Sequence, residues 1–196
     1  AAVGDSVAAR ACVGTFHSRM WALLREGRPC DGRGRAEALI GSERCRTRLW
    51  QLLGPYLKTI GSDLDVKACA DISARLREAC VDSGDAEGGV DPAALAIAEA
   101  VVGESDAYRA LKAAATYERL KSERGLIDYT DMLAIVYDAV VVGEPWAVAL
   151  RSRFECIAID EAQDTSLLQS RLVDELKAGA RAILWTGDVS QSLYAW

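Results

Sequence analysis

Two adjacent carboxylates, Asp160 and Glu161, directly follow a largely apolar run over residues 154–159. Such a run is typical of a strand buried in a parallel sheet, and α/β sheets bind their ligands at the carboxyl ends of strands. At such a place one carboxylate can hold Mg²⁺, and its neighbour can accept a proton from the water that attacks a γ-phosphate. The alternative is that both acids only cap the next helix, and these two residues taken alone favour that alternative.

A second polar segment follows the next apolar run, residues 182–185, and contains Gln191, Tyr194 and Trp196. The Gln191 amide can donate a hydrogen bond to a phosphate oxygen, and aromatic rings in a polar loop are suited to stacking on unpaired bases. The competing interpretation is that both rings anchor a hydrophobic core. The two apolar runs flank a predicted helix over residues 166–178, which makes a strand–helix–strand unit. Both polar segments should therefore leave the same edge of a parallel sheet.

The elements that position these segments are mostly helical. Apolar spacing, helix-start residues and Gly-rich breaks predict helices over residues 16–25, 36–53, 66–81, 105–124 and 128–142, a helix that begins at Asp91 and Pro92, a short strand over residues 11–15, and loops over residues 26–35 and 82–90. Within residues 105–124, the predicted core stripe consists of Tyr108, Leu111, Ala115 and Leu120. The layout is an α/β layer interrupted by a helical insertion over residues 26–125.

Composition narrows the class of protein. Hydrophobic residues make up 51% of the chain, which is enough for a core, and no apolar run approaches the ~18 residues of a membrane span. With no signal-peptide pattern at the start, we expect a cytoplasmic protein. The chain has six cysteines without a CxxC pair and a single histidine, which argues against a zinc site and favours reduced, packed thiols.

The charge is unevenly distributed along the chain. The net charge is −6, but residues 1–60 hold ten Lys or Arg against five Asp or Glu, which gives +5 and leaves −11 for the remainder. A basic third beside an acidic remainder fits a protein that presents one face to nucleic acid. Solvated arginines on helix surfaces explain the same charges equally well.

Four segments, taken in order, resemble motifs of the UvrD/Rep/PcrA family of superfamily 1A DNA helicases. They are GTFHS at residues 14–18, GLIDYTDML at residues 125–133, DEAQDT at residues 160–165 and GDVSQSLYAW at residues 187–196. The first is similar to the family's TFHS motif, the second to the helix start before motif II, and the last two to motifs II and III. Each segment alone is short, but their order and spacing agree along the whole chain.

The resemblance implies an ATP site with Mg²⁺. Asp160 would coordinate the Mg²⁺ ion, and Glu161 would be the catalytic base. Gln191 would sense the γ-phosphate and couple it to DNA, so these three residues would face the nucleotide. Asp164 and Thr165 either serve this site or cap the following helix, and we favour the cap. Asp128 and Asp131 are expected to be mainly structural.

The resemblance also implies a path for single-stranded DNA. Thr15, Phe16 and His17 would lie along the strand, and Tyr194 and Trp196 would stack on its bases. The only histidine is therefore interpreted as a DNA contact, with a buried structural role as its alternative.

The family fold would place residues 1–25 and 126–196 in a RecA-like P-loop NTPase domain (1A), here partial, and residues 26–125 in a helical 1B insertion. The arginines of that insertion either contact duplex phosphates or line a solvated helix face; they are Arg33, Arg35, Arg44, Arg46 and Arg48.

The phosphate-binding pattern G-x-x-x-x-G-K-[ST] does not occur in these 196 residues. The family places it before the TFHS motif and binds ATP between two RecA-like domains. We therefore expect an internal fragment of a 3′→5′ translocase and helicase that acts on single strands and single-strand/duplex junctions, and that is inactive without its remaining helicase domains. Two alternatives stay open: an ATPase-inactive module that binds single-stranded DNA, and the motor part of a helicase–nuclease of the AddA/RecB kind.

Overall fold

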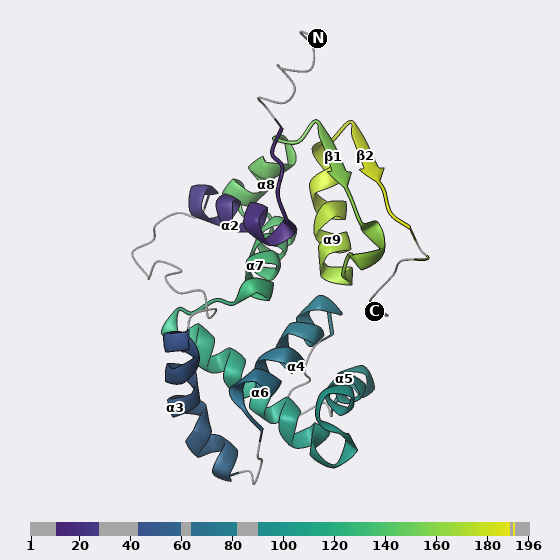
Figure 1. Ribbon diagram of the computed structural model, residues 1–196. Coiled ribbons are helices and arrows are strands. Elements are labelled where there is room, and N and C mark those ends of the chain that lie inside the picture. Colours follow the sequence, from purple (N-terminus) through teal and green to yellow (C-terminus); the bar gives the residue numbers. More distant parts are fainter. Residues whose placement is uncertain (1–10, 28–42, 60–63, 82–89, 189, 191–196) are drawn as a thin grey trace.

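The computed structural model describes residues 11–27, 43–59, 64–81, 90–188 and 190. These residues form a mostly helical structure with one small parallel sheet (Figure 1). The elements, in chain order, are α2 (Phe16–Gly27), α3 (Glu43–Thr59), α4 (Val66–Glu78), α5 (Pro92–Val102), α6 (Glu104–Arg124), α7 (Tyr129–Val142), α8 (Pro145–Arg151), β1 (Cys156–Ile159), η1 (Ala162–Asp164), α9 (Leu167–Leu176), η2 (Lys177–Gly179) and β2 (Ala182–Trp185).

The predicted strand–helix–strand unit is present as β1, α9 and β2. The two strands are parallel, with Cys156 opposite Ala182 and Ile159 opposite Trp185. Helix α9 contributes Leu168, Leu172 and Leu176, at a spacing of four, to the core cluster against which Ile157 of β1 packs. The prediction of a parallel pair is therefore confirmed.

The prediction that both strands are buried is wrong for the described residues. Cys156 and Ala158 are exposed, and 56% of Leu184 is accessible to solvent. The cause is that the described helices cover the face of Ile157, so the opposite face of the pair is open. Side chains alternate between the two faces of a strand, which explains the alternation of half-buried and exposed residues along β1.

The expected strand over residues 11–15 is absent, because the described residues there lead directly into α2 without regular structure. Val13 is 86% exposed. A strand is stable only when its peptide groups find a ladder partner, and the sheet of the described residues consists of β1 and β2. The apolar residues alone were therefore a poor guide at this segment.

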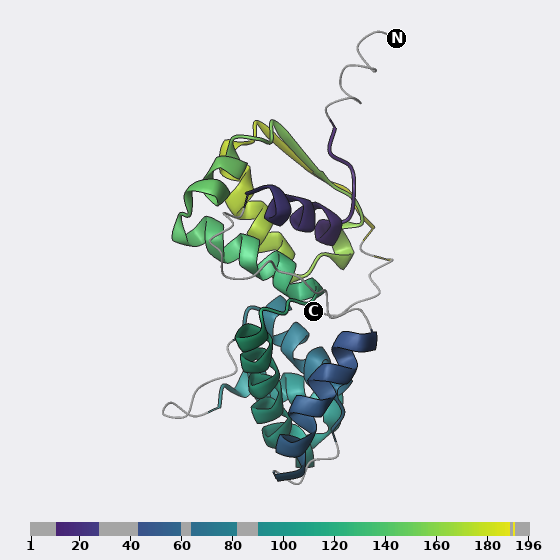
Figure 2. The same ribbon diagram turned by 90° about the vertical axis from the view of Figure 1, so that its left-hand side faces the viewer.

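Helices α3–α6 form a group of their own, which contacts the group of α2, α7–α9 and the strands through α4 (Figure 2). Two apolar clusters hold it together, and α6 contributes to both: Ala113, Tyr117 and Leu120 face α3 and α4, while Ala110 and Ala114 face α4 and α5. Because α6 packs on two sides, its core face differs from the predicted stripe. Leu111 and Leu120 are buried, but Tyr108 and Ala115 are exposed.

Helix α3 continues to Thr59, beyond its predicted end at residue 53. Gly54 and Pro55 are residues that usually interrupt a helix. Here Leu49, Leu53 and Leu57 recur every four residues and are all buried, so one apolar stripe continues through the interruption. The predicted start of this helix, residues 36–42, lies outside the described residues.

The connection between α6 and α7 is short and anchored at both ends. Gly125 ends α6 in the left-handed conformation, with φ of 63°. Leu126 then packs against the cluster shared by α3, α4 and α6, whereas Ile127 is buried in the cluster of α2, α7 and α9. Asp128, the first residue of the helix predicted there, caps α7 and forms a reciprocal capping box with Asp131. Two consecutive side chains thus anchor the chain in two different cores.

Two further predictions concern the cysteines and membranes. Among the cysteines whose side chains the structure describes, which are free thiols, Cys69 is buried and Cys12 and Cys156 are exposed, so packing explains fewer of them than expected. No single helix among the described residues is long and apolar enough to span a membrane. The pair α7 and α8 meets those criteria only when the two helices are taken together, and the pair is bent by 94°.

Candidate functional site

The ends of β1 and β2 are joined at the edge where the predicted carboxylates lie. Asp160 and Glu161 are exposed. The Thr186 hydroxyl donates to Asp160 Oδ1 over 2.8 Å, and the Glu161 amide donates to the same oxygen over 3.0 Å. The Ala162 amide also donates to the Thr186 carbonyl over 2.8 Å. The segments after the two strands therefore leave the same edge, as predicted.

Glu161 has an unusual backbone conformation for a residue with a side chain. Its φ and ψ are 52° and 46°, in the left-handed region. This conformation costs a non-glycine residue about 1–3 kcal/mol, and such residues cluster at functional sites. The turn directs the chain away from β1 immediately after Asp160, so the two carboxylates are presented at the strand end.

Gln163 connects the two segments and was not singled out from the sequence. Its Nε2 donates to Glu161 Oε2 over 2.6 Å, and its Oε1 accepts from the Asp188 amide over 3.0 Å. Gly187 lies against this side chain, and a Cβ there would overlap Gln163 Oε1 and lie 2.9 Å from the Ala162 nitrogen. The sequence signal for Gln163 was its position inside the DEAQDT segment. Its contact with Asp188 could not be predicted from that segment, because the contact depends on the register of β1 and β2.

The cap predicted for Asp164 and Thr165 is wrong. Helix α9 is capped by Ser166, whose hydroxyl accepts from the Gln169 amide while the Gln169 side chain accepts from the Ser166 amide. Asp164 instead ends the short helix η1. Ser166 directly precedes Leu167, the first residue of α9, so its hydroxyl is within reach of the first free amides of the helix.

Three of the predicted site residues cannot be located. Gln191, Tyr194 and Trp196 lie outside the described residues. The chain is described as far as an Asx-type turn, in which the Ser190 amide and hydroxyl both donate to Asp188 Oδ1, over 2.9 and 2.7 Å.

The predicted DNA residues at the start of α2 have three different environments. Thr15 is exposed and caps the helix, because its Oγ1 accepts from the Ser18 amide over 3.2 Å. Phe16 is partly buried against the core cluster of α2, α7 and α9. The half-buried His17 ring meets the Tyr129 ring edge to face, with 5.9 Å between centroids. Burial lowers the pKa of the His17 imidazole, which favours the neutral form of the ring.

Tyr129 is an aromatic residue that the sequence did not single out as a contact. It is the first residue of α7 and is 55% exposed. Helix α7 packs on α2 and on α9. It therefore lies between the helix that carries His17 and the helix that follows the Asp160–Glu161 edge.

A buried group of charges lies near the start of α7, where α4, α6 and α7 meet. The Lys121 side chain is only 2% exposed, and its Nζ lies 2.6 Å from Glu118, 2.7 Å from Asp128 and 2.9 Å from Asp131. Arg77 of α4 bridges Glu118 at 2.7 Å and Asp131 at 3.5 Å. The three carboxylates lie close enough together to hold a metal ion. The Lys121 ammonium already supplies the cation, so the cluster is structural.

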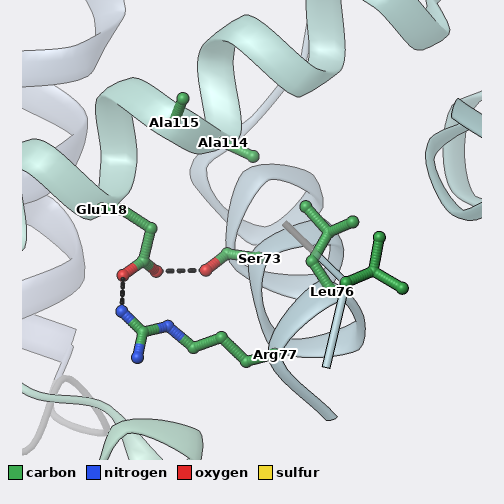
Figure 3. A pocket seen from close by; sticks show the side chains of 7 residues that line it. Ser73, Leu76, Arg77, Ala114, Ala115 and Glu118 are labelled. Carbon is green, nitrogen blue, oxygen red and sulfur yellow. Dashed lines mark hydrogen bonds and ion pairs between the residues drawn. The ribbon is translucent and has the colours of Figure 1, made fainter. Parts of the chain in front are cut away.

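A cavity of about 330 Å³ opens beside the same charges and is shown in Figure 3. Its polar wall consists of Ser73, Arg77 and Glu118, and its apolar wall includes Leu76 and Ala114. The Ser73 hydroxyl and the Arg77 guanidinium both donate to the Glu118 carboxylate. These polar groups therefore satisfy one another.

Comparisons with known proteins point to one family. The family model of the UvrD/REP helicase N-terminal domain matches residues 2–196. The chain is 34% identical over 84 residues to an ATP-dependent helicase/nuclease subunit of Lysinibacillus sphaericus, which covers 38% of this chain and 7% of that protein. It is 35% identical over 81 residues to the same-named protein of Staphylococcus haemolyticus, with 38% of this chain and 7% of that protein covered.

A third relative has a different name. The RecBCD enzyme subunit RecB of Mycolicibacterium smegmatis is 30% identical over 83 residues, or 42% of this chain and 8% of that protein. The chain thus spans less than a tenth of the length of each of these three relatives. The family model, in contrast, accounts for nearly the whole chain. The chain belongs to the UvrD/REP helicase N-terminal domain family.

Proposed function

We propose that this chain is part of an ATP-driven motor that translocates on single-stranded DNA and unwinds duplexes, with Glu161 as the general base for ATP hydrolysis. The observation that carries the proposal is the strand edge itself. Two exposed carboxylates end β1, one of them in a left-handed conformation, and hydrogen bonds tie them to the end of β2. The family match and the names of the relatives support the same activity.

Asp160 is the residue that would hold Mg²⁺. Both hydrogen bonds that it accepts from described residues reach Oδ1, and its carboxylate is exposed beyond the strand end, which suits an oxygen-binding cation. When bound, Mg²⁺ would neutralise charge on the phosphates of ATP. Gln191, by its place after β2, is proposed to donate to the γ-phosphate.

Glu161 would accept the proton of the attacking water. A general base must lie within hydrogen-bond reach of that water, and the Glu161 carboxylate is exposed at the edge where the nucleotide would lie. The Gln163 amide donates to Oε2, which restrains the carboxylate.

The single strand would run along the starts of α2 and α7. Thr15 is an exposed residue with a hydroxyl, the His17 ring can donate a hydrogen bond, and Tyr129 is an exposed aromatic residue. Phe16 supports these residues from the core side. Tyr194 and Trp196 are proposed to stack on bases next to them, and the 3′→5′ direction is taken from the family.

The division into domains is part of the same proposal. Residues 1–25 and 126–196 would belong to a RecA-like domain 1A, and residues 26–125 would form the 1B insertion. The separate apolar clusters of α3–α6 and of α2, α7–α9 support a boundary near Leu126 and Ile127. Single-strand/duplex junctions are the proposed substrate, and the remaining helicase domains are the proposed partners in the full-length protein.

A helicase–nuclease motor is the second candidate. It is favoured by the names of the relatives, two of which are called ATP-dependent helicase/nuclease and one RecB. Both candidates share the same ATP site. The ATPase-inactive module is less favourable, because it has no use for the Asp160–Glu161 edge.

The test is Glu161→Gln in the full-length protein. The substitution removes the proton acceptor and keeps the shape, so DNA-stimulated ATP turnover should fall by about 10²–10⁴-fold, while binding of a fluorescent ATP analogue with Mg²⁺ persists. Glu155→Gln is the matched control, because Glu155 is an exposed acid directly before β1. Turnover close to that of the unsubstituted protein in Glu161→Gln would contradict the proposal.

A further inference from the structure

The side chain of Gln163 uses both ends of its amide. The N–H group donates to the carboxylate of Glu161 over 2.6 Å, and the carbonyl accepts from the backbone of Asp188 over 3.0 Å. One partner lies after β1 and the other after β2. The two bonds therefore join the carboxylate at one strand end to the backbone turn at the other.

Gly187 provides the space that this bridge needs. A Cβ at residue 187 would overlap the carbonyl oxygen of Gln163 and lie 2.9 Å from the nitrogen of Ala162. That nitrogen donates to the Thr186 carbonyl and cannot withdraw without breaking its own bond. Any side chain at residue 187 would therefore push the Gln163 amide away from Asp188.

The strand ends do not depend on this bridge for their cohesion. The Thr186 amide donates to the Ile159 carbonyl, and the Thr186 hydroxyl donates to Asp160, each over 2.8 Å. These bonds remain when Gln163 is changed. The Gln163 amide is thus dispensable for joining β1 to β2, and its distinctive contact is with the Glu161 carboxylate.

We propose that Gln163 is a positioning residue that makes the location of the Glu161 carboxylate depend on the location of the Gly187–Asp188 turn. This rests on the proposed function, in which Glu161 accepts the proton. The turn leads, within the next eight residues of the sequence, to Gln191, Tyr194 and Trp196. Any change in the position of the Asp188 amide is therefore passed through the Gln163 side chain to the Glu161 carboxylate.

The first experiment uses Gln163→Met and Gln163→Glu in the full-length protein. Methionine keeps the length without either hydrogen bond, whereas glutamate keeps the acceptor and loses the donor. With oligo-dT present, kcat for ATP should fall roughly ten- to hundredfold in both variants, because a small misplacement of a reacting group has that effect. The KM for ATP and the melting temperature should stay unchanged, which a merely structural role would not predict.

Gln169→Met is the matched control. Gln169 also bonds through its side chain, but it caps α9 and makes its bond to the Ser166 amide. Its loss should lower the melting temperature slightly and leave kcat unchanged.

The second experiment is a double-mutant cycle of Gln163→Ala and Gly187→Ala. If Gly187→Ala acts by displacing the Gln163 amide, its fold reduction in kcat should be clearly smaller when residue 163 is already alanine. Equal reductions in both backgrounds would overturn the bridge.

The outcomes separate this inference from the function on which it rests. Unchanged kcat in Gln163→Met, beside an inactive Glu161→Gln, would refute the role of Gln163 and leave the proposed function standing. Near-normal turnover in Glu161→Gln would refute both.

Discussion

Replacing Lys121 by methionine should be among the most destabilising single changes in this chain. The substitution keeps the length of the side chain and removes the ammonium that lies between Glu118, Asp128 and Asp131. Arg77 would then be the only cation that the described residues place against three carboxylates, and it contacts two of them. Removing one partner of a buried ion pair costs about 3–5 kcal/mol, because the remaining charge stays buried without compensation.

This loss of stability corresponds to a measurable shift in melting temperature. For a protein of this size, 1 kcal/mol corresponds to about 2–4 °C, so the melting temperature at neutral pH should fall by roughly 6–20 °C. Lys112→Met is the control on the same helix. That exposed lysine lies 4.5 Å above the Tyr108 ring, a contact worth about 0.5–1 kcal/mol.

The same cluster predicts how the penalty depends on pH. Burial alone would raise the pKa of the Asp128 carboxyl, but Lys121, the Asp131 amide and Arg77 together outweigh burial and hold the pKa below its ordinary value. The stability that this group contributes is therefore present above its unfolded pKa of about 3.9 and is lost as pH falls through the lower folded value. Burial would lower the pKa of Lys121, yet the carboxylates outweigh it and raise that pKa.

The contribution of Lys121 is consequently present below its unfolded pKa of about 10.4 and is lost as pH rises through the folded value. The difference between the unsubstituted protein and Lys121→Met should be largest near neutral pH and shrink toward about pH 4, where protonation relieves the carboxylates. Adding Asp131→Asn to Lys121→Met should recover part of the loss. A penalty below about 1 kcal/mol at pH 7, or no recovery with Asp131→Asn, would refute this reasoning.

Two further predictions concern Gly125 and Tyr129. Gly125→Ala should lower the free energy of unfolding by about 1–2 kcal/mol, because φ is 63° and only backbone strain opposes a side chain there. Gly54→Ala inside α3, in contrast, should be neutral or stabilising. Denaturant titration of both variants checks whether the two changes have opposite signs. Tyr129→Ala should weaken binding of the full-length protein to oligo-dT about 5- to 150-fold in a fluorescence titration. Tyr108→Ala is the control, because Tyr108 is an exposed tyrosine on α6. Equal affinities of the two variants for oligo-dT would exclude Tyr129 from the DNA surface.

Local chemistry made much of the architecture predictable. Asp91 and Asp128 are helix caps because a carboxylate can accept from the first free amides of a helix, and both lie where the sequence predicts that a helix begins. The β1–α9–β2 unit was also predictable, since its apolar runs are bounded by turn residues. That unit alone brings Asp160 and the segment after β2 to one edge.

The predictions that failed concern features that depend on contacts between residues distant in the sequence. Residues 11–15 have strand-like composition, but their state depends on a ladder partner. A lysine in a helix is usually exposed, and the burial of Lys121 becomes favourable only once α7 brings Asp128 and Asp131 beside it. Gln163 resembled any polar residue of a turn until the strand register placed Asp188 within its reach.

The connection between α6 and α7 has a mechanical consequence. Leu126 is held in one apolar core and Ile127 in the next, and the Lys121 cluster clamps both helix ends around them. This connection therefore has no unanchored residue about which the two groups of helices could rotate freely. A load applied to α3–α6, for instance by duplex pressed against them, would reach α7 as a torque. Tyr129, in the first turn of α7, would be the first residue of that helix to be displaced by the torque.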